Sequence, residues 1–531
     1  MGEDRRSFWG WGLESKALDG ARKNNLKAMV SMQLGRIETA EIVPPKIEEI
    51  ELRKPRIAPP ESLKTIFDSS PFERAGHSYG KSFRDVVRGL ARNFSNPPDL
   101  VAFPRSEADI SQVMDWCGSK NYALMIYGGG STVAAGVEPP AGNWPGCVSL
   151  DLRYLDKILE IDSRSRAARI QGGIYGPALE AGLKESGLTL RHFPQSFEFS
   201  TLGGWIATRS GGHFATNRTH IEDFVESVRM ITPAGAVESR RLPASGAGPQ
   251  VERFVAGSEG TLGVITEAWV RLQERPRYRA GTSIKFPDYS EAVAAVRDLA
   301  QSDLFPTNCR LLDPTEAMVS GTAIGKDAIL LVAFESADHS PEAAMKRALD
   351  ICRAHGGKFP DDAATVRSGG DREGAAGNWR RTFLEGPYLR DALACLGMVI
   401  ETFETAVTWD KFDAFHAGIL EAVRGALGKV CGKGIVSCRF THAYPDGVAP
   451  YYTVIGPGRA GSQLSQWNEI KAAASEAILR FGGTITHHHS VGRDHRPWYD
   501  RERPELFAKA LLAAKQAVDP KGILNPGVLV G

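Results

Sequence analysis

Short apolar runs separated by an amphipathic stretch mark the region after residue 95. Four of these runs have the length of buried strands, at 100–103, 123–127, 148–152 and 168–173. One helical face is formed by apolar residues spaced three and four apart, Ile110, Val113, Met114 and Cys117, with Ser106 as the N-cap. A second helix is expected at 176–185, with Pro177 in its first turn. This mixture of strands and helices predicts an α+β domain.

The same alternation returns after residue 280 and indicates a second α+β domain. Helical patterns lie at 287–302 and 341–354. Strand patterns lie at 308–313, 329–334, 399–405 and 436–442. Residues 1–70 show little periodicity and several prolines, so an extended, linker-like segment is expected there.

Composition and charge narrow the classes of function. Charged residues make up 24% of the chain, the net charge is +1 and there is no basic stripe, so no nucleic-acid partner is expected. No apolar run reaches the roughly 18 residues of a membrane-spanning helix, and a cytoplasmic location is expected. The seven cysteines are scattered without a CxxC pair, so no zinc site, disulfide framework or other metal site is predicted.

Three segments combine glycines with hydroxyl side chains, at 128–132, 191–213 and 255–266. Glycine lets the backbone approach a ligand closely, and serine and threonine hydroxyls can donate to phosphate oxygens. Each segment taken alone fits a tightly packed helix start or a turn between strands equally well. Their recurrence in one chain favours a nucleotide cradle.

These loops, together with residues 519–527, resemble the vanillyl-alcohol-oxidase type of FAD-binding protein. Within that family, residues 197–209, 221–223 and 486–492 resemble the alkyldihydroxyacetonephosphate synthases. The resemblance implies a two-domain FAD-binding type-4 (PCMH) fold of the α+β class, with an inserted α+β cap domain. It divides the chain into an N-terminal extension with a helical segment (1–94), an FAD domain (95–275), a substrate-binding cap (276–499) and a C-terminal return to the FAD domain (500–531).

The resemblance also implies a cofactor, FAD, held non-covalently. The pyrophosphate would be cradled by successive N–H groups and hydroxyls at Gly128, Gly129, Gly130, Ser131 and Thr132. The cradle would continue and flank the isoalloxazine ring at Ser196, Thr201, Gly204, Thr208 and Ser210. Further contacts with FAD are implied at Glu259, Gly260, Gly263, Ile265 and Asn525.

A tyrosine and a run of histidines are the candidates for proton transfer. Tyr451 lies in the sequence context of the family's catalytic tyrosine, although a tyrosine on a strand is more often a core residue. His487, His488 and His489 are also assigned to catalysis, because a neutral imidazole accepts a proton near pH 7 and a protonated one holds phosphate. A metal-binding or surface tract is the alternative. On a strand only His487 and His489 would share a face, unless the segment is a loop.

Two arginines are candidates for binding charge. Arg390 matches a family arginine near the flavin, where it would act in catalysis and in substrate binding. Arg310 matches a second arginine with a structural or phosphate-contacting role, and His489 is also expected to contact substrate. A surface salt bridge is the alternative for either arginine.

The implied reaction exchanges the acyl group of acyl-dihydroxyacetone phosphate for a long-chain alcohol, through a bond between flavin N5 and substrate C1. Tyr451, helped by the histidines, would move the C1 proton, and no external oxidant would be needed. The implied partners are the lipid substrate, a second copy in a homodimer and the surface of a membrane. Two alternatives stay open: an FAD-dependent oxidase or dehydrogenase of a hydroxy acid or phenolic alcohol, and a flavin-binding protein without turnover.

Overall fold

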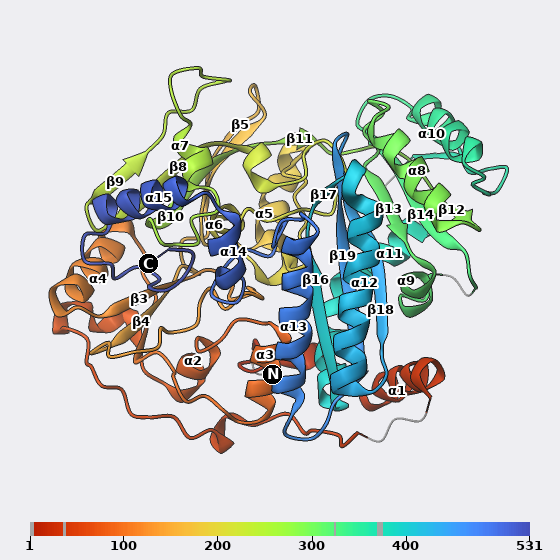
Figure 1. Cartoon of the computed structure of the whole chain (residues 1–531). Helices are drawn as coiled ribbons and strands as arrows, with labels where there is room; N and C mark the ends of the chain where they lie inside the picture. Colours follow the sequence, from red (N-terminus) through yellow and green to blue (C-terminus); the bar gives the residue numbers. More distant parts are fainter. Residues whose placement is uncertain (1–4, 36–38, 323–324, 369–374, 531) are drawn as a thin grey trace.

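The computed structural model describes residues 5–35, 39–322, 325–368 and 375–530, with the backbone alone described for 375–383. Figure 1 shows two α+β regions side by side, with the sheets of the first domain on one side and the large sheet of the second domain on the other. The predicted α+β class and its two-domain organisation are therefore confirmed.

Within the described residues, the first domain contains two larger sheets and a two-stranded pair, β7 with β11. In one, β2, β4 and β3 pair in parallel, with β1 antiparallel at the edge. The other is antiparallel, in the order β5-β6-β10-β8-β9. The strands are β1 Phe67–Asp68, β2 Leu100–Ala102, β3 Ala123–Tyr127, β4 Cys147–Asp151, β5 Ile158–Asp162, β6 Ala167–Gln171, β7 Leu188–Thr189, β8 Val225–Thr232, β9 Gly235–Glu238, β10 Val264–Arg271 and β11 Gln273–Glu274. The helices are α2 Pro71–Gly76, α3 Phe83–Leu90, α4 Glu107–Lys120, α5 Gly176–Leu183, α6 Leu202–Thr208 and α7 Val251–Val255.

Helix α4 shows how local sequence builds this domain. The Ser106 hydroxyl accepts the Asp109 N–H at 3.2 Å, and the Asp109 carboxylate accepts the Ser106 N–H at 3.0 Å. Such a reciprocal cap stabilises a helix start by about 1 kcal/mol. The predicted apolar face is buried and packs into the core beneath β3 and β4. Both the predicted N-cap and the predicted face of this helix are confirmed.

The second domain is built on a large, mainly antiparallel sheet in the order β15-β12-β14-β13-β18-β19-β16, with β17 beside β19. Figure 1 shows α12 and α13 lying together along this sheet. The strands are β12 Tyr278–Phe286, β13 Asn308–Leu312, β14 Ala328–Ser336, β15 Val366–Ser368, β16 Met398–Glu404, β17 Val407–Thr408, β18 Ile435–Ala443 and β19 Gly447–Pro457. The helices are α8 Tyr289–Ala300, α9 Pro314–Val319, α10 Glu342–Ala354, α11 Ala375–Cys395, α12 Trp409–Cys431 and α13 Gln463–Arg480.

The N-terminal extension is not only linker-like, as the sequence predicted. It contains helix α1, Gly20–Leu34, capped by the Asp19 side chain, which accepts the Arg22 N–H at 2.8 Å. This helix buries Leu26, Val30 and Leu34 in the core of the second domain. The apolar face of this helix is narrow and is surrounded by lysines and asparagines. Packing on the second domain, rather than the sequence pattern, therefore stabilises the helix.

The C-terminal segment returns to the first domain through α14, Arg496–Glu502, and α15, Glu505–Val518. Leu124 on β3 donates its N–H to Ile523 O at 2.8 Å, and Asn525 donates its N–H to Leu124 O at 3.0 Å. Figure 1 shows the C-terminus beside the first domain, far along the chain from the strands it joins. Within the described residues, no helix combines the length and apolar character needed to cross a bilayer.

Candidate active site

The three glycine and hydroxyl segments line one cavity between the two domains. All fifteen residues assigned to FAD binding from the sequence contribute to its lining. They are Gly128, Gly129, Gly130, Ser131, Thr132, Ser196, Thr201, Gly204, Thr208, Ser210, Glu259, Gly260, Gly263, Ile265 and Asn525. From the second domain, Tyr451, His488, His489, Arg390 and Arg310 line the same cavity. Residues far apart in the sequence therefore share one site.

The loop after β3 has the properties of an anion cradle. Within the described part of the chain, the backbone N–H groups of residues 129–132 donate to no protein acceptor. Unpaired amides on a buried loop are suited to an anionic ligand such as a pyrophosphate. A Cβ on Gly129 would lie 2.0 Å from Phe199 O, so only glycine allows the first and second loops to approach this closely. These residues therefore fit the phosphates of FAD.

Glu259 and Asn525 hold the third loop and the C-terminal return against β3. The Asn525 side chain donates to Glu259 O at 2.6 Å and accepts the Ile126 N–H at 2.7 Å. The Glu259 carboxylate accepts the N–H groups of Val491 and Gly492, each at 2.7 Å. Burial raises the pKa of Glu259 to about 7, although these two N–H groups oppose the shift.

The histidine segment is a loop rather than a strand, and it wraps around the buried carboxylate of Glu404. The backbone N–H groups of His487, His488 and His489 donate to this carboxylate at 2.7, 3.1 and 2.9 Å. The Thr486 hydroxyl donates to it at 2.6 Å. Burial raises the pKa of Glu404, but the three histidines and Thr486 outweigh burial and hold the pKa well below its ordinary value. The carboxylate therefore fixes the loop through its backbone, and the Nδ1 atoms of His488 and His489 also lie 3.3 and 3.8 Å from it.

Tyr451 and His489 lie side by side in the cavity. Their ring centres are 5.5 Å apart, and the ring of Tyr451 is also next to His488. Burial raises the pKa of Tyr451, with Arg439 opposing the shift. Burial lowers the pKa of His489 to about 3, with Glu404 opposing. At neutral pH the phenol therefore keeps its proton and the imidazole is neutral, so the pair offers one proton donor and one acceptor.

Tyr452 faces away from the cavity, as expected for the next residue on a strand. Its hydroxyl lies 2.9 Å from His416 Nδ1, and its ring stacks on Phe403 in the core of the second domain.

The two predicted arginines occupy different environments. Arg390 lines the cavity from α11 and pairs with Asp391 at 2.9 Å. Arg310 is almost fully buried on β13, where its Nη2 donates to His213 O at 3.1 Å. Burial and the neighbouring Arg439 lower the pKa of Arg310 to about 9. A surface salt bridge does not describe either residue.

Comparisons with known proteins identify the chain. Residues 98–239 match the FAD binding domain family, and residues 275–529 match the FAD linked oxidases, C-terminal domain. The alkyldihydroxyacetonephosphate synthase of Dictyostelium discoideum is 31% identical over 512 residues, which cover 91% of this chain and 83% of that protein. The chain belongs to the alkyldihydroxyacetonephosphate synthase family. FAD is the cofactor that its matched domains and family membership assign.

Other alkyldihydroxyacetonephosphate synthases support the assignment. The synthase of Trypanosoma brucei brucei is 29% identical and is covered over 77% of its length, against 86% of this chain. A solved alkyldihydroxyacetonephosphate synthase structure superposes with a TM-score of 0.80 at 26% identity, covering 98% of this chain and 97% of the other. p-Cresol methylhydroxylase shares the fold alone, with a TM-score of 0.67 at 14% identity over 96% of this chain and 97% of the other.

In this member of the alkyldihydroxyacetonephosphate synthase family, His487 does not line the cavity. Its Nε2 lies 2.8 Å from the Tyr444 hydroxyl, and its ring packs against His220. Sequence reasoning also missed Glu404, Arg439 and His442. Each lies on a strand of the second domain, where a single polar residue carries no local signal of its role.

Proposed function

We propose that this chain exchanges the acyl group of acyl-dihydroxyacetone phosphate for a long-chain alcohol, releasing a fatty acid. The observation that carries the proposal is the pairing of Tyr451 with His489 in the cavity that the FAD loops also line. The C1–O bond to the acyl group breaks and a C1–O bond to the alcohol forms. Electrons are conserved between substrates and products, so no oxidant is consumed.

Bound FAD supplies a ring that can take up and return an electron pair. The residues of this chain handle the proton and the charge. Tyr451, held protonated by burial, is placed to donate a hydrogen bond or a proton at the reacting end of the substrate. His489, held neutral, is placed to accept the proton that leaves C1 and to return it afterwards.

The lining of the cavity fits an anionic lipid. Arg310, Arg390 and Arg439 supply positive charge that can hold a phosphate or a departing carboxylate. Other parts of the lining are apolar and suited to an alkyl chain: Leu26, Met29, Val319, Leu389 and Leu393. A substrate with one phosphate and one long chain meets both kinds of surface.

The experiment is incubation of the purified, FAD-loaded protein with acyl-dihydroxyacetone phosphate and a fatty alcohol, followed by mass spectrometry. We expect an ether product and one fatty acid released per ether formed. Fatty acid release without ether would contradict the exchange. Bleaching of the flavin by a hydroxy acid or phenolic alcohol, with no ether formed, would favour the oxidoreductase alternative. That alternative has weaker support. The glycolate oxidase subunit GlcD of Bacillus subtilis is 26% identical to this chain, whereas the synthase of Dictyostelium discoideum is 31% identical.

We also propose that the enzyme forms a homodimer and touches membranes peripherally, both by analogy with its family. Helix α1 supports the second point, since Leu26 and Met29 line the cavity while Met32 on the same helix is 84% exposed. Light scattering tests the dimer, and co-sedimentation with anionic vesicles tests the membrane contact.

A further inference from the structure

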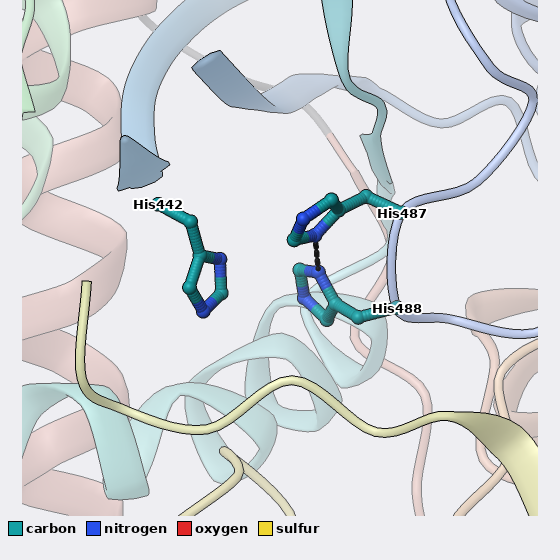
Figure 2. Close-up of side chains that lie close together, drawn as sticks. All are labelled: His442, His487 and His488. Atoms are coloured by element: carbon teal, nitrogen blue, oxygen red, sulfur yellow. Dashed lines mark hydrogen bonds between the residues drawn. The ribbon is translucent and has the colours of Figure 1, made fainter. Parts of the chain in front are cut away.

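Three buried histidines converge beside the cavity. His442 is the next-to-last residue of strand β18, and His487 and His488 come from the loop around Glu404. One ring nitrogen of each lies within 4.8 Å of the others, and the two Nδ1 atoms of His487 and His488 are 2.9 Å apart. Figure 2 shows a ring nitrogen of His442 turned toward the two loop histidines. Burial lowers the pKa of all three imidazoles, so they are neutral at physiological pH and each keeps a lone pair.

The tautomer of His442 is fixed by a backbone carbonyl. Its Nε2 lies 3.0 Å from Gly212 O, an atom that can only accept a hydrogen bond. Nε2 therefore carries the proton, and the lone pair lies on Nδ1. The Thr441 hydroxyl lies 3.1 Å from this Nδ1, and a bound ion would take the place of that contact. A histidine whose outer N–H is donated to a carbonyl in this way is typical of a metal ligand, because the outer bond orients the ring.

A longer chain of hydrogen bonds fixes the tautomer of His487. It starts at His220, whose Nε2 lies 3.0 Å from His487 O and must donate to that carbonyl. With its ring proton on Nε2, His220 accepts from the Thr219 hydroxyl through Nδ1 at 3.0 Å.

The donor and acceptor roles along the remaining hydrogen bonds, up to His487, follow from these two contacts. Since the Thr219 hydroxyl donates to His220, its oxygen accepts from the Tyr444 hydroxyl at 2.9 Å. The Tyr444 oxygen in turn accepts from His487 Nε2 at 2.8 Å. The lone pair of His487 therefore also lies on Nδ1. His442 and His487 therefore both donate through Nε2 and carry their lone pairs on Nδ1. The two assignments rest on separate hydrogen bonds, to Gly212 O and to the Tyr444 oxygen.

His488 completes the cluster and links it to a charge. Its Nδ1 supplies the proton in the contact with His487 Nδ1, and it lies 3.3 Å from the Glu404 carboxylate. An ion seated between the two rings would replace this proton, which would then lie on His488 Nε2. The buried Glu404 carboxylate would offset part of the charge of the ion.

We propose that His442, His487 and His488 bind one first-row divalent cation of the zinc type through their Nδ1 atoms. Three imidazoles suit Zn²⁺ and its neighbours rather than Mg²⁺ or Ca²⁺. Metal–nitrogen bonds of about 2.0–2.1 Å place ligand atoms closer together than the observed limit of 4.8 Å, so small ring rotations complete the site. Three protein ligands leave a fourth position open, as in catalytic zinc sites. His442 and His488 also line the cavity, so an oxygen atom of a bound substrate can occupy that position.

Zinc binding by the untagged, FAD-loaded protein tests the proposal independently of turnover. The protein is treated with a chelator, equilibrated with ZnCl2, desalted and analysed for zinc by mass spectrometry. We expect about one ion per chain in the wild type, and binding at least tenfold weaker in His442→Gln, which lacks a ligand. In Tyr444→Phe all three ligands remain, but the acceptor for His487 Nε2 is lost, and we expect about 10–100-fold weaker binding.

His416→Gln is the matched control, because His416 is partly buried in the same domain and bonds to Tyr452 outside the cluster. It should bind zinc as the wild type does. Equal zinc uptake by the wild type and His442→Gln would overturn the proposal, as would absence of uptake by the wild type. If His442→Gln loses FAD or fails to fold, Tyr444→Phe decides: unchanged affinity there contradicts the proposed site.

Discussion

The guanidinium carbon of Arg439 lies 3.9 Å from the centre of the Tyr451 ring, while Arg439 Nη1 donates to the Glu316 carboxylate at 2.7 Å. A cation over an aromatic face attracts the ring and holds its orientation. The ring of Tyr451, which lines the cavity, is thereby held in place by a residue that is itself anchored by a buried carboxylate. The position of Tyr451, the proposed proton donor, thus depends on the ion pair between Arg439 and Glu316.

Replacing Tyr451 by phenylalanine should remove acyl exchange and leave FAD bound. Loss of a positioned acid or base lowers rates by about 10²–10⁴-fold, while the FAD-binding loops are untouched. Product formation and the ratio of flavin to protein absorbance provide the two measurements. Tyr452→Phe is the control, since that hydroxyl contacts His416 in the core, and it should keep its exchange activity. Turnover by Tyr451→Phe at the wild-type rate would remove Tyr451 from the mechanism.

Replacing Arg439 by glutamine should destabilise the fold strongly. The side chains of Arg439 and Glu316 are 10% and 5% exposed, so the variant leaves a buried carboxylate without its counter-ion. Removing one partner of a buried pair costs about 3–5 kcal/mol of unfolding free energy. Urea unfolding measures the loss, and adding Glu316→Gln should restore part of it. Arg501→Gln, which breaks an exposed pair with Glu476, should cost less than about 1 kcal/mol. Equal losses in the two single variants would contradict this account.

Replacing Gly129 by alanine should lower the FAD content of the purified protein. The new methyl group would lie 2.0 Å from Phe199 O and 2.7 Å from Ser200 Cα, so the first two loops would have to separate. Flavin absorbance per chain measures the effect. Gly246→Ala is the control, because nothing lies within 4 Å of its added Cβ. Full FAD occupancy in Gly129→Ala would show that the close approach of these loops is not needed.

The buried carboxylate of Asp99 should make the free energy of unfolding fall at low pH. Burial raises its pKa, but hydrogen bonds from Arg56 and Arg53 outweigh burial and lower it from 3.8 to about 2. Because the folded pKa is the lower one, the stabilisation is complete above pH 3.8 and is lost as the pH falls through 2. Near neutral pH the free energy of unfolding of the wild type should exceed that of Asp99→Asn by up to about 2 kcal/mol. Below pH 2 the two free energies should converge. A difference that stays constant from neutral pH down to pH 2 would exclude this carboxylate as the source.

Elements with strong local signals could be predicted from the sequence. Helix α4 has a reciprocal cap and a periodic face, and the strand at 328–336 contains the apolar run 329–334. Helix α1 escaped prediction because its stability comes from packing on the second domain rather than from its own pattern. The FAD loops were assigned through family resemblance, since glycines alone do not show that three distant loops meet.

The missing parts of the site depend on contacts between distant residues. Glu404 is one polar residue at the end of a strand, and only the fold reveals that the backbone of residues 487–489 wraps around it. His442 lies 45 positions before His487, in a segment that reads as an ordinary strand. No spacing rule joins such residues, so their convergence becomes visible only with coordinates.

The anchoring of the N-terminal segment bears on how the enzyme is assembled. Arg6 donates to Gly129 O at 2.6 Å, and the Trp11 N–H donates to Asp391 at 2.5 Å across 380 positions of sequence. On the ribosome, residues 6–11 emerge long before their second anchor has been translated. We therefore expect residues 6–11 to dock only after the second domain has folded. FAD would then bind before the N-terminal segment covers its site.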